Sequence, residues 1–307
     1  MNALYIEELN QRFGQSDDKG QIRFKMGKGD IPVVEIENEQ ASALISCQGA
    51  HVLSWRPDGQ EEVIWVSREA RYAKGQSVRG GIPICWPWFG AHSENTSFPA
   101  HGFARTVLWE ITEACQLDSG ETQISFILNT SQLDDTTRKT WPESTSALYV
   151  LTIGHSLKLE LITQNNGVKA ICVGEALHTY FNVGDVSKTS VTGLHGKDYL
   201  DKPDGFKRKK QSGDIGIDAE VDRVYLNTTD ELSITGPQRK IVISKQGSHS
   251  TIVWNPWKQV AEKMGDLGEG GYLNMLCVES GNAADDVVTI KPGESHTLQV
   301  VYRVENN

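Results

Sequence analysis

The chain has 307 residues, of which 38% are hydrophobic and 23% are charged. This composition is typical of a folded globular protein and not of a disordered one. The 40 acidic residues outnumber the 30 basic ones, which gives a formal net charge of −10. Because a nucleic-acid-binding protein needs a basic face to neutralise phosphates, we expect no nucleic-acid partner.

The first predicted element is a helix over residues 3–13. Its apolar residues Ile6, Leu9 and Phe13 fall on one helical face. We expect this helix, within residues 1–20, to lie at the periphery of the fold.

Most of the remaining chain consists of short β-branched or aromatic segments separated by Gly, Pro, Asn and Asp. The fifteen segments are IPVVEIE, SALISC, HVLSW, EEVIWVS, TVLWEIT, TQISFIL, ALYVLTIG, LKLELIT, ICVGEAL, LSITG, KIVIS, HSTIVW, LCVES, VVTIK and HTLQVVYRV. Strands at this spacing predict an all-β fold, either a large β-sandwich or a barrel. Since no linker or repeat interrupts the pattern, we expect one domain over residues 1–307.

Two long stretches lack clear strand signals. Residues 68–105 are rich in Gly, Pro and aromatic residues, and residues 195–222 include the basic run Lys207–Lys210. Long loops on an antiparallel scaffold often carry functional sites. The basic run itself is expected to be a solvated loop.

The second predicted helix covers residues 256–264. Asn255 suits the N-cap and Pro256 the first helical position, and Gly265 suits the C-terminal stop.

The five cysteines indicate a reducing compartment. They are widely spread and form no CxxC motif, and they are Cys47, Cys85, Cys115, Cys172 and Cys277. The N-terminus resembles no secretion signal, and no apolar run approaches the roughly 20 residues of a membrane-spanning helix. We therefore expect a cytoplasmic protein with reduced thiols and no membrane partner.

Several well-known catalytic motifs are missing from the sequence. It contains no GxSxG, GxxxxGK[ST] or HExxH motif and no GxGxxG motif that links a strand to a helix. This argues against common serine hydrolases, P-loop enzymes, zincins and dinucleotide-dependent oxidoreductases. General acid–base chemistry by His, Asp and Glu remains, with Arg available to bind an anion.

Three residues are candidates for acid–base chemistry. His178 ends a predicted strand between aromatic residues and can exchange protons near neutral pH. Glu279 ends the apolar segment LCVES, where burial would raise its pKa towards that of a general base. Asp222 lies in VDRVY, beside a turn. Each also fits a structural role, as a hydrogen-bonded histidine, a solvated strand-end glutamate or a turn aspartate.

Two arginines bracket the first irregular stretch. Arg79 and Arg105 can each hold a phosphate or carboxylate through two parallel hydrogen bonds, or can form ordinary surface ion pairs. The aromatic residues between them can supply an apolar wall for a sugar ring or can belong to the core.

A set of motifs, in order along the chain, resembles those of a known family. The motifs are RGGIPICWPWFG (79–90), PAHGFAR (99–105), ALHTYFNV (176–183), VDRVY (221–225), VWNPW (253–257) and CVESGN (277–282). Together they resemble the aldose 1-epimerase, or galactose mutarotase-like, superfamily, and more specifically the D-hexose-6-phosphate mutarotases. The resemblance spans roughly residues 50–303, and its specificity comes from the ordered set.

The resemblance implies a large antiparallel β-sandwich of the galactose mutarotase type with a few short helices. It also implies an isomerase that interconverts the α and β anomers of a hexose 6-phosphate such as glucose 6-phosphate. By position, His178 matches the catalytic acid and Glu279 matches the catalytic base.

The same resemblance assigns four substrate-binding residues. Asp222 matches a substrate-binding aspartate, and Arg79 and Arg105 match arginines that bind the substrate and its phosphate. His101 matches a second histidine of the wider family, which holds sugar hydroxyls or the ring oxygen.

Two positions depart from the family pattern. Ala100 precedes His101 where some phosphosugar members carry Gln, and Ser280 follows Glu279 where Pro often stands. Neither departure removes a catalytic group, but both leave the preferred sugar open.

The implied reaction needs no cofactor. Mutarotation opens a cyclic hemiacetal and closes it from the other face, so one base and one acid suffice. The reaction involves no redox change, so it needs no nicotinamide. It involves no phosphoryl transfer, so it needs no magnesium. We therefore expect no cofactor and no metal, a small hexose phosphate as the partner, and a monomer.

Three alternatives share this scaffold. A sugar-phosphate binding protein would not need a matched acid and base. A glycoside-processing enzyme would usually need two carboxylates about the bond that is cleaved. A mutarotase of unphosphorylated aldoses would not need the two arginines.

Overall fold

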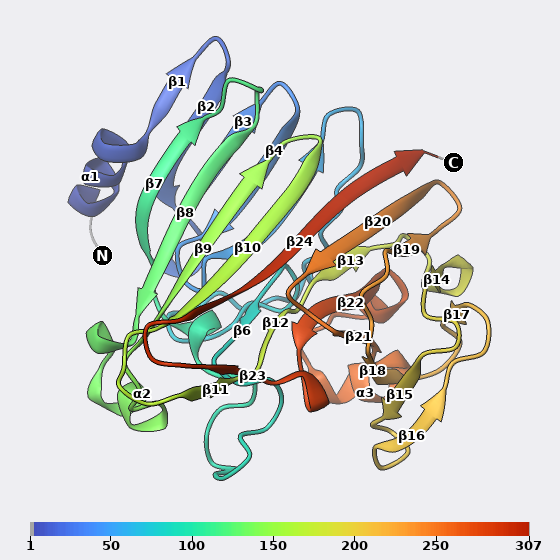
Figure 1. Ribbon diagram of the computed structural model, residues 1–307. Coiled ribbons are helices and arrows are strands. Elements are labelled where there is room, and N and C mark those ends of the chain that lie inside the picture. Colours follow the sequence, from blue (N-terminus) through green and yellow to red (C-terminus); the bar gives the residue numbers. More distant parts are fainter. Residues whose placement is uncertain (1–2, 307) are drawn as a thin grey trace.

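The computed structural model describes residues 3–306 as layers of antiparallel β-sheet. A nine-stranded sheet runs across the molecule. A five-stranded sheet lies by its β7–β10 end, and an eight-stranded sheet lies by its β19–β20 end (Figure 1). The predicted antiparallel β-sandwich is therefore confirmed.

The nine-stranded sheet is built from the longest alternating segments. Its central strands alternate buried and partly buried residues, as expected where one face covers the core. In sheet order the strands are β17 (Ile215–Gly216), β14 (Ser190–Thr192), β19 (Leu232–Thr235), β20 (Arg239–Gln246), β24 (Ser295–Asn306), β10 (Ser156–Asn165), β9 (Thr145–Ile153), β8 (Thr122–Asn129) and β7 (Glu110–Gln116).

The eight-stranded sheet contains the strands on which the site is built. In sheet order they are β16 (Lys207–Lys210), β15 (Asp198–Asp201), β18 (Val221–Leu226), β21 (Ser250–Asn255), β22 (Met275–Asn282), β12 (Glu175–Leu177) and β6 (Ile84–Cys85), with β13 (Tyr180–Asn182) also paired to β22. Side chains on β21 and β22 alternate between the two faces. Val253 and Val278 enter the main core, whereas Ile252 and Cys277 beside them belong to separate buried clusters on the other face of the sheet.

The N-terminal half supplies the smaller sheets. The five-stranded sheet consists of β1 (Gln15–Asp17), β2 (Gly20–Met26), β3 (Pro32–Asn38), β4 (Ala41–Ser46) and β5 (His51–Pro57). A two-stranded sheet pairs β11 (Ile171–Val173) with β23 (Val288–Ile290).

The predicted helices are found near their expected bounds. Helix α1 (Ala3–Phe13) buries Leu9 against the core, as its periodicity indicates, whereas residues 1–2 lie outside the described part of the chain. A short helix, α2 (Asp135–Thr140), is capped by the Asp134 side chain. The remaining helical turns are 3-10 turns, namely Lys28–Asp30, Ala104–Thr106, Thr130–Gln132, Val186–Lys188, Gly271–Leu273 and Ala284–Asp286.

Helix α3 (Trp257–Met264) begins one residue later than predicted. Pro256 precedes the helix instead of occupying its first position. The predicted capping side chain still acts there, because Asn255 Oδ1 accepts a 2.8 Å hydrogen bond from the Trp257 amide. Gly265 ends the helix in the left-handed conformation, as predicted, with φ of 70°.

Four strand-level expectations were wrong. The segment ICVGEAL is divided at Gly174 into β11 and β12, which belong to different sheets. The basic run Lys207–Lys210 is strand β16 and not a loop, because its side chains pair with Asp198, Asp201 and Asp204 across the hairpin. The segment EEVIWVS makes only isolated bridges, since its residues pair in turn with different parts of the chain. The segment TVLWEIT begins as a 3-10 turn, and its strand starts only at Glu110.

The sheets share one large hydrophobic core. Among its largest fully buried side chains are Trp55, Trp86, Trp109 and Tyr149. Among the described residues, no helix has the length and apolar character needed to cross a membrane.

Candidate active site

A cleft of about 760 Å³ lies over the outer face of the eight-stranded sheet. Strands β13, β18, β21 and β22 contribute to its lining, together with loops from residues 77–105 and the hairpin between β15 and β16. All six residues that the sequence singled out line this one cleft. They are Arg79, His101, Arg105, His178, Asp222 and Glu279.

His178 and Glu279 are brought together by strand pairing. Glu279 lies on β22, and β12 pairs with that strand so that Leu177 is opposite Ser280. His178 follows Leu177 directly, and its backbone amide donates a 3.0 Å hydrogen bond to the Pro83 carbonyl. The result is a distance of 3.4 Å between His178 Nε2 and Glu279 Oε1.

Burial changes the protonation of this pair. Glu279 is 1% exposed, and desolvation followed by the nearby Asp222 charge raises its pKa well above its ordinary value. Desolvation, and then the neighbouring His101 and Arg105, lowers the pKa of His178 well below its ordinary value. Both shifts favour the uncharged form of each group, so the empty pair holds one proton, on Glu279, and the His178 imidazole is neutral.

Each member of the pair keeps one unused polar atom. Within residues 3–306, Nδ1 of His178 and Oε2 of Glu279 are buried and have no hydrogen-bond partner. Buried polar atoms are normally paired, so these two atoms are suited to a bound ligand.

His101 faces the same cleft from a strained loop. It has a φ of 67°, and its Nδ1 accepts a hydrogen bond from the Gly90 amide at 3.3 Å. Its ring lies 5.8 Å from the ring of His178. Desolvation, followed by the Arg105 charge, lowers the pKa of His101 to about 3, so its imidazole is neutral near pH 7.

The two predicted arginines are fixed in different ways. Arg79 donates from Nε to Asp266 at 3.0 Å and from Nη1 to the Tyr180 hydroxyl at 3.1 Å. Arg105 donates from Nη2 to the Ala100 carbonyl at 2.9 Å. Both positions place a guanidinium at the cleft wall, where it can bind an anion.

The two departures from the family pattern lie in different places. Ala100 lines the cleft, so a longer side chain at this position would reach the ligand space. Ser280 is 1% exposed and is paired with both neighbouring strands of the sheet. The first departure therefore bears on ligand contacts and the second on packing.

Asp222 forms an ion pair with Lys202, a cationic site residue that the sequence did not indicate. Its Oδ2 lies 2.7 Å from Nζ of Lys202, and the Lys202 amide also donates to the Asp222 carbonyl. Lys202 stands in the turn KPDG, where a lysine has no distinguishing pattern. A local signal was its nearness in sequence to the basic run Lys207–Lys210, which was interpreted only as solvated surface.

Three aromatic residues of the cleft were also missed as site residues. The Tyr180 ring stacks on the His178 ring at 5.0 Å, and the Trp254 ring lies edge-on to the same imidazole at 5.9 Å. Phe206 is 55% exposed at the hairpin and lines the cleft. The motifs HTYF and VWNPW contained the first two, but aromatic residues are more often core residues.

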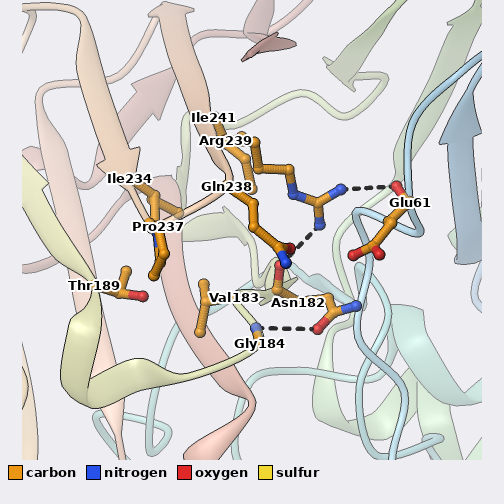
Figure 2. Close-up of a pocket in the computed structure, with 11 residues that line it drawn as sticks. Glu61, Asn182, Val183, Gly184, Thr189, Ile234, Pro237, Gln238, Arg239 and Ile241 are labelled. Atoms are coloured by element: carbon orange, nitrogen blue, oxygen red, sulfur yellow. Dashed lines mark hydrogen bonds between the residues drawn. The ribbon is translucent and has the colours of Figure 1, made fainter. Parts of the chain in front are cut away.

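Polar contacts of residues outside the cleft lining hold the strands of the site. Arg239 donates to the carbonyls of Glu61 and Asn182 (Figure 2). It also donates to the Glu62 carbonyl, and together these bonds tie down the end of β13. The hydroxyls of Ser248 and Ser250 each donate to the Gly281 carbonyl, two residues beyond Glu279.

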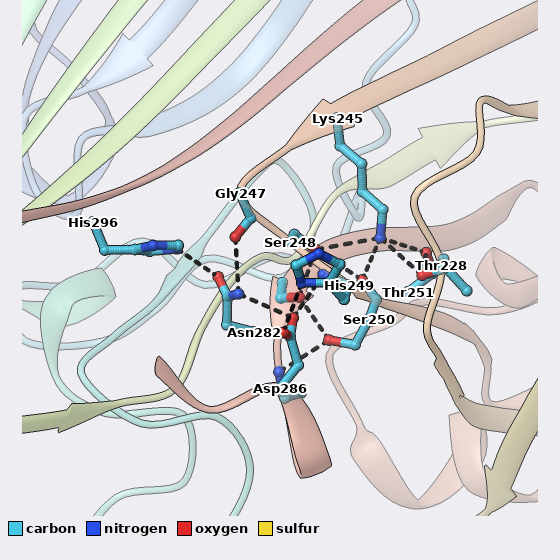
Figure 3. A network of polar contacts seen from close by, with 12 residues as sticks. Thr228, Lys245, Gly247, Ser248, His249, Ser250, Thr251, Asn282, Asp286 and His296 are labelled. Carbon is cyan, nitrogen blue, oxygen red and sulfur yellow. Dashed lines mark hydrogen bonds and ion pairs between the residues drawn. The ribbon is translucent and has the colours of Figure 1, made fainter. Parts of the chain in front are cut away.

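The buried Lys245 belongs to the second of these networks (Figure 3). Its Nζ donates to the hydroxyls of Thr228, Ser248 and Thr251 and to the Ser250 carbonyl. Because β20, β21 and β22 are joined here, the network supports the strand that carries Glu279.

The fold and the site now identify the class of protein. The sequence profile of the family described as "Aldose 1-epimerase" matches residues 32–303. This chain belongs to the aldose 1-epimerase family, and the resemblance inferred from the ordered motifs is confirmed.

Individual relatives agree with this assignment. The chain is 34% identical over 275 residues to an Escherichia coli (strain K12) protein named "Putative glucose-6-phosphate 1-epimerase", and the match covers 89% of this chain and 90% of that protein. A Salmonella typhimurium protein with the same name is 34% identical over 254 residues, with coverage of 82% and 83%.

Solved structures agree on the architecture. A Salmonella typhimurium crystal structure described as a "putative mutarotase" superimposes with a TM-score of 0.86 at 30% identity and covers 95% of this chain and 96% of that one. Galactose 1-epimerase from Lactobacillus acidophilus superimposes with a TM-score of 0.67 over 95% and 97% of the two chains. At 12% identity, that second likeness supports the fold alone.

Proposed function

We propose that this enzyme interconverts the α and β anomers of a hexose 6-phosphate such as glucose 6-phosphate. The observation that carries the proposal is that an acid–base pair and three cationic side chains line one cleft of about 760 Å³. The curated relatives named for glucose-6-phosphate 1-epimerase activity support the same substrate.

In the proposed mechanism Glu279 and His178 act on the two oxygens of the anomeric carbon. The proton of the pair first passes from Glu279 to His178. Glu279 then removes the proton of the anomeric hydroxyl while His178 protonates the ring oxygen, and the bond from the anomeric carbon to the ring oxygen breaks. The open aldehyde rotates about its bond to the next carbon. The ring closes from the other face as His178 takes its proton back and Glu279 returns one to the new hydroxyl.

The single proton of the pair suits this reaction. Ring opening and ring closure each remove one proton from the sugar and supply another, so the number of protons on the pair is unchanged. The neutral imidazole of His101 lies beside the pair and can bond to sugar hydroxyls without adding a charge.

The proposed phosphate site uses Arg79, Arg105 and Lys202. Guanidinium groups bind phosphate through paired, charge-assisted hydrogen bonds, and the ammonium adds a third positive charge. A cluster of cations on a chain with a net charge of −10 favours an anionic over a neutral sugar.

The proposal also covers the location, oligomeric state and partners of the enzyme. A cytoplasmic location is supported by the five cysteines, which are all free thiols, as is usual in a reducing compartment. A monomer is supported by the origin of all six candidate residues in a single chain. The small cleft supports a small sugar as the partner and not a nucleic acid or a membrane.

Exchange spectroscopy on the anomeric protons tests the function. Glucose 6-phosphate and glucose are each measured with and without the protein. Faster α–β exchange for the phosphosugar is the expected result, and equal acceleration of both sugars would support a mutarotase of unphosphorylated aldoses instead. No acceleration of either sugar, with ligand line broadening still present, would support a non-catalytic binding protein.

A further inference from the structure

Cys277 lies beside the acid–base pair but has no role in the proposed mechanism. It is two residues from Glu279 on β22, so both side chains point to the same face of the sheet. Cys277, His178 and Glu279 each offer one donor atom, and these three atoms lie within 4.8 Å of one another. A nitrogen and an oxygen from the cleft lining and the sulfur of the fully buried Cys277 therefore converge.

This spacing is close to that of a metal site. Tetrahedral zinc has bond lengths of about 2.3 Å to sulfur and about 2.0 Å to nitrogen and oxygen, which place the donors roughly 3.3–3.5 Å apart. The pair of His178 and Glu279 already lies at 3.4 Å. The widest separation, at most 4.8 Å, needs to shorten by about 1.3 Å, which is within reach of small side-chain rotations.

The donors are also available. In the described part of the chain, His178 Nε2 and Glu279 Oε1 have only their 3.4 Å contact with each other, and Cys277 is a free thiol. A divalent cation bound by one thiolate and one carboxylate forms a neutral unit, which avoids leaving a net charge in a buried position.

The donor set selects the kind of metal. Mg²⁺ and Ca²⁺ prefer sites made of oxygen alone, whereas thiolate and imidazole favour Zn²⁺ and its softer analogue Cd²⁺. Three protein ligands leave a fourth position open toward the cleft.

We propose that Cys277, His178 and Glu279 form a site for Zn²⁺ or Cd²⁺, and that the bound ion excludes the sugar from the acid–base pair. The inhibitory part rests on the proposed function, whereas the binding part does not. The site has no sequence motif, because its ligands are a Cys-x-Glu pair and a histidine 99 residues away.

Cadmium binding can be measured without turnover. A cysteine thiolate bound to Cd²⁺ gives an ultraviolet charge-transfer absorption, so a titration with CdCl₂ reports both the site and its thiol. The more accessible thiols are first removed in a Cys115→Ser, Cys172→Ser background, because they would bind Cd²⁺ on their own. We expect one Cd²⁺ per chain with a thiolate band in this background, and absence of the band would overturn the proposal.

Variants identify the ligands. Cys277→Ala in the same background is expected to abolish the band, and Cys47→Ala, another buried thiol, is expected to retain it. Glu279→Gln is a second test that keeps the thiol, and it is expected to weaken binding at least tenfold. A band that persists in folded Cys277→Ala, or unchanged affinity in folded Glu279→Gln, would refute this site.

The two proposals fail separately. If Cd²⁺ binds but no sugar shows accelerated exchange, the metal site stands and the proposed function does not. If exchange is accelerated but no thiolate band forms, the function stands and the metal site does not. If both hold, glucose 6-phosphate should raise the apparent Kd for Cd²⁺, and Cd²⁺ should reduce turnover in the background protein but not in Cys277→Ala, each relative to its own metal-free rate.

Discussion

Nε2 of His178 and Oε1 of Glu279 lie 3.4 Å apart, slightly farther than a typical hydrogen bond between nitrogen and oxygen. The two groups are therefore close enough for the protonation of one to influence the other, but they do not form a strong hydrogen bond with each other. A hydroxyl of a bound sugar can reach either group without first breaking a strong ion pair. A distance of this length is consistent with a catalytic pair whose hydrogen bonds shorten only when the substrate is bound.

Removing either member of the pair is expected to stop catalysis. Glu279→Gln and His178→Ala should each lower kcat for anomer exchange by about 100-fold or more, since positioned acids and bases typically contribute about 10²–10⁴-fold. Circular dichroism checks that the variants fold. Glu175→Gln is a matched control, because Glu175 is also a buried strand glutamate but does not line the cleft. Retained turnover in either folded variant would contradict the assigned roles.

Removing a phosphate-binding cation should affect binding more than chemistry. Arg105→Ala is expected to raise KM for glucose 6-phosphate by about tenfold or more, because a charge-assisted hydrogen bond is worth about 1.5–3 kcal/mol. Any exchange of neutral glucose should change little. Arg208→Ala is the control, since Arg208 is an exposed arginine on β16 that pairs with Asp198 on the neighbouring strand β15. An unchanged KM for Arg105→Ala would remove this residue from the phosphate site.

Asp266 is expected to position Arg79. Its carboxylate accepts a 3.0 Å hydrogen bond from Arg79 Nε, and this contact orients the guanidinium toward the cleft. Asp266→Asn should raise KM for the phosphosugar by roughly three- to tenfold and leave kcat nearly unchanged, because a neutral amide is a weaker acceptor. Glu269→Gln, on the same turn, provides the comparison. A fall in kcat without a change in KM would show that Asp266 acts on the chemistry instead.

The sequence predicted the fold class because the long strands carry their own pattern. Segments such as LKLELIT alternate so regularly that their period specifies a strand with one buried face. Strand β16 could not be recognised in the same way. Its residues are stabilised by carboxylates on a hairpin partner and not by a buried face, so four basic residues resemble solvated surface.

The site was partly predictable for a similar reason. His178 and Glu279 stand in motifs, but their separation of 3.4 Å results from the pairing of β12 with β22, which no local pattern specifies. Lys202 stands in no motif, and Cys277 stands in CVESGN, where the sequence assigned no role to it. Each enters the site through its register with a neighbouring strand, and register depends on tertiary structure.

Lys245 is expected to make stability depend on pH. Burial lowers its pKa to about 7 from an unfolded value of about 10.5. Between these values the unfolded chain binds more protons than the folded one, so the free energy of unfolding should rise with pH, by up to about 1.4 kcal/mol per pH unit. Denaturant unfolding at about pH 7 and about pH 9 should show this rise in the wild type. Lys245→Met should lose it, whereas Lys240→Met, an exposed lysine on the same strand, should keep it. Equal pH dependence in wild type and Lys245→Met would mean that the four oxygen acceptors around Nζ keep the ammonium charged throughout this range.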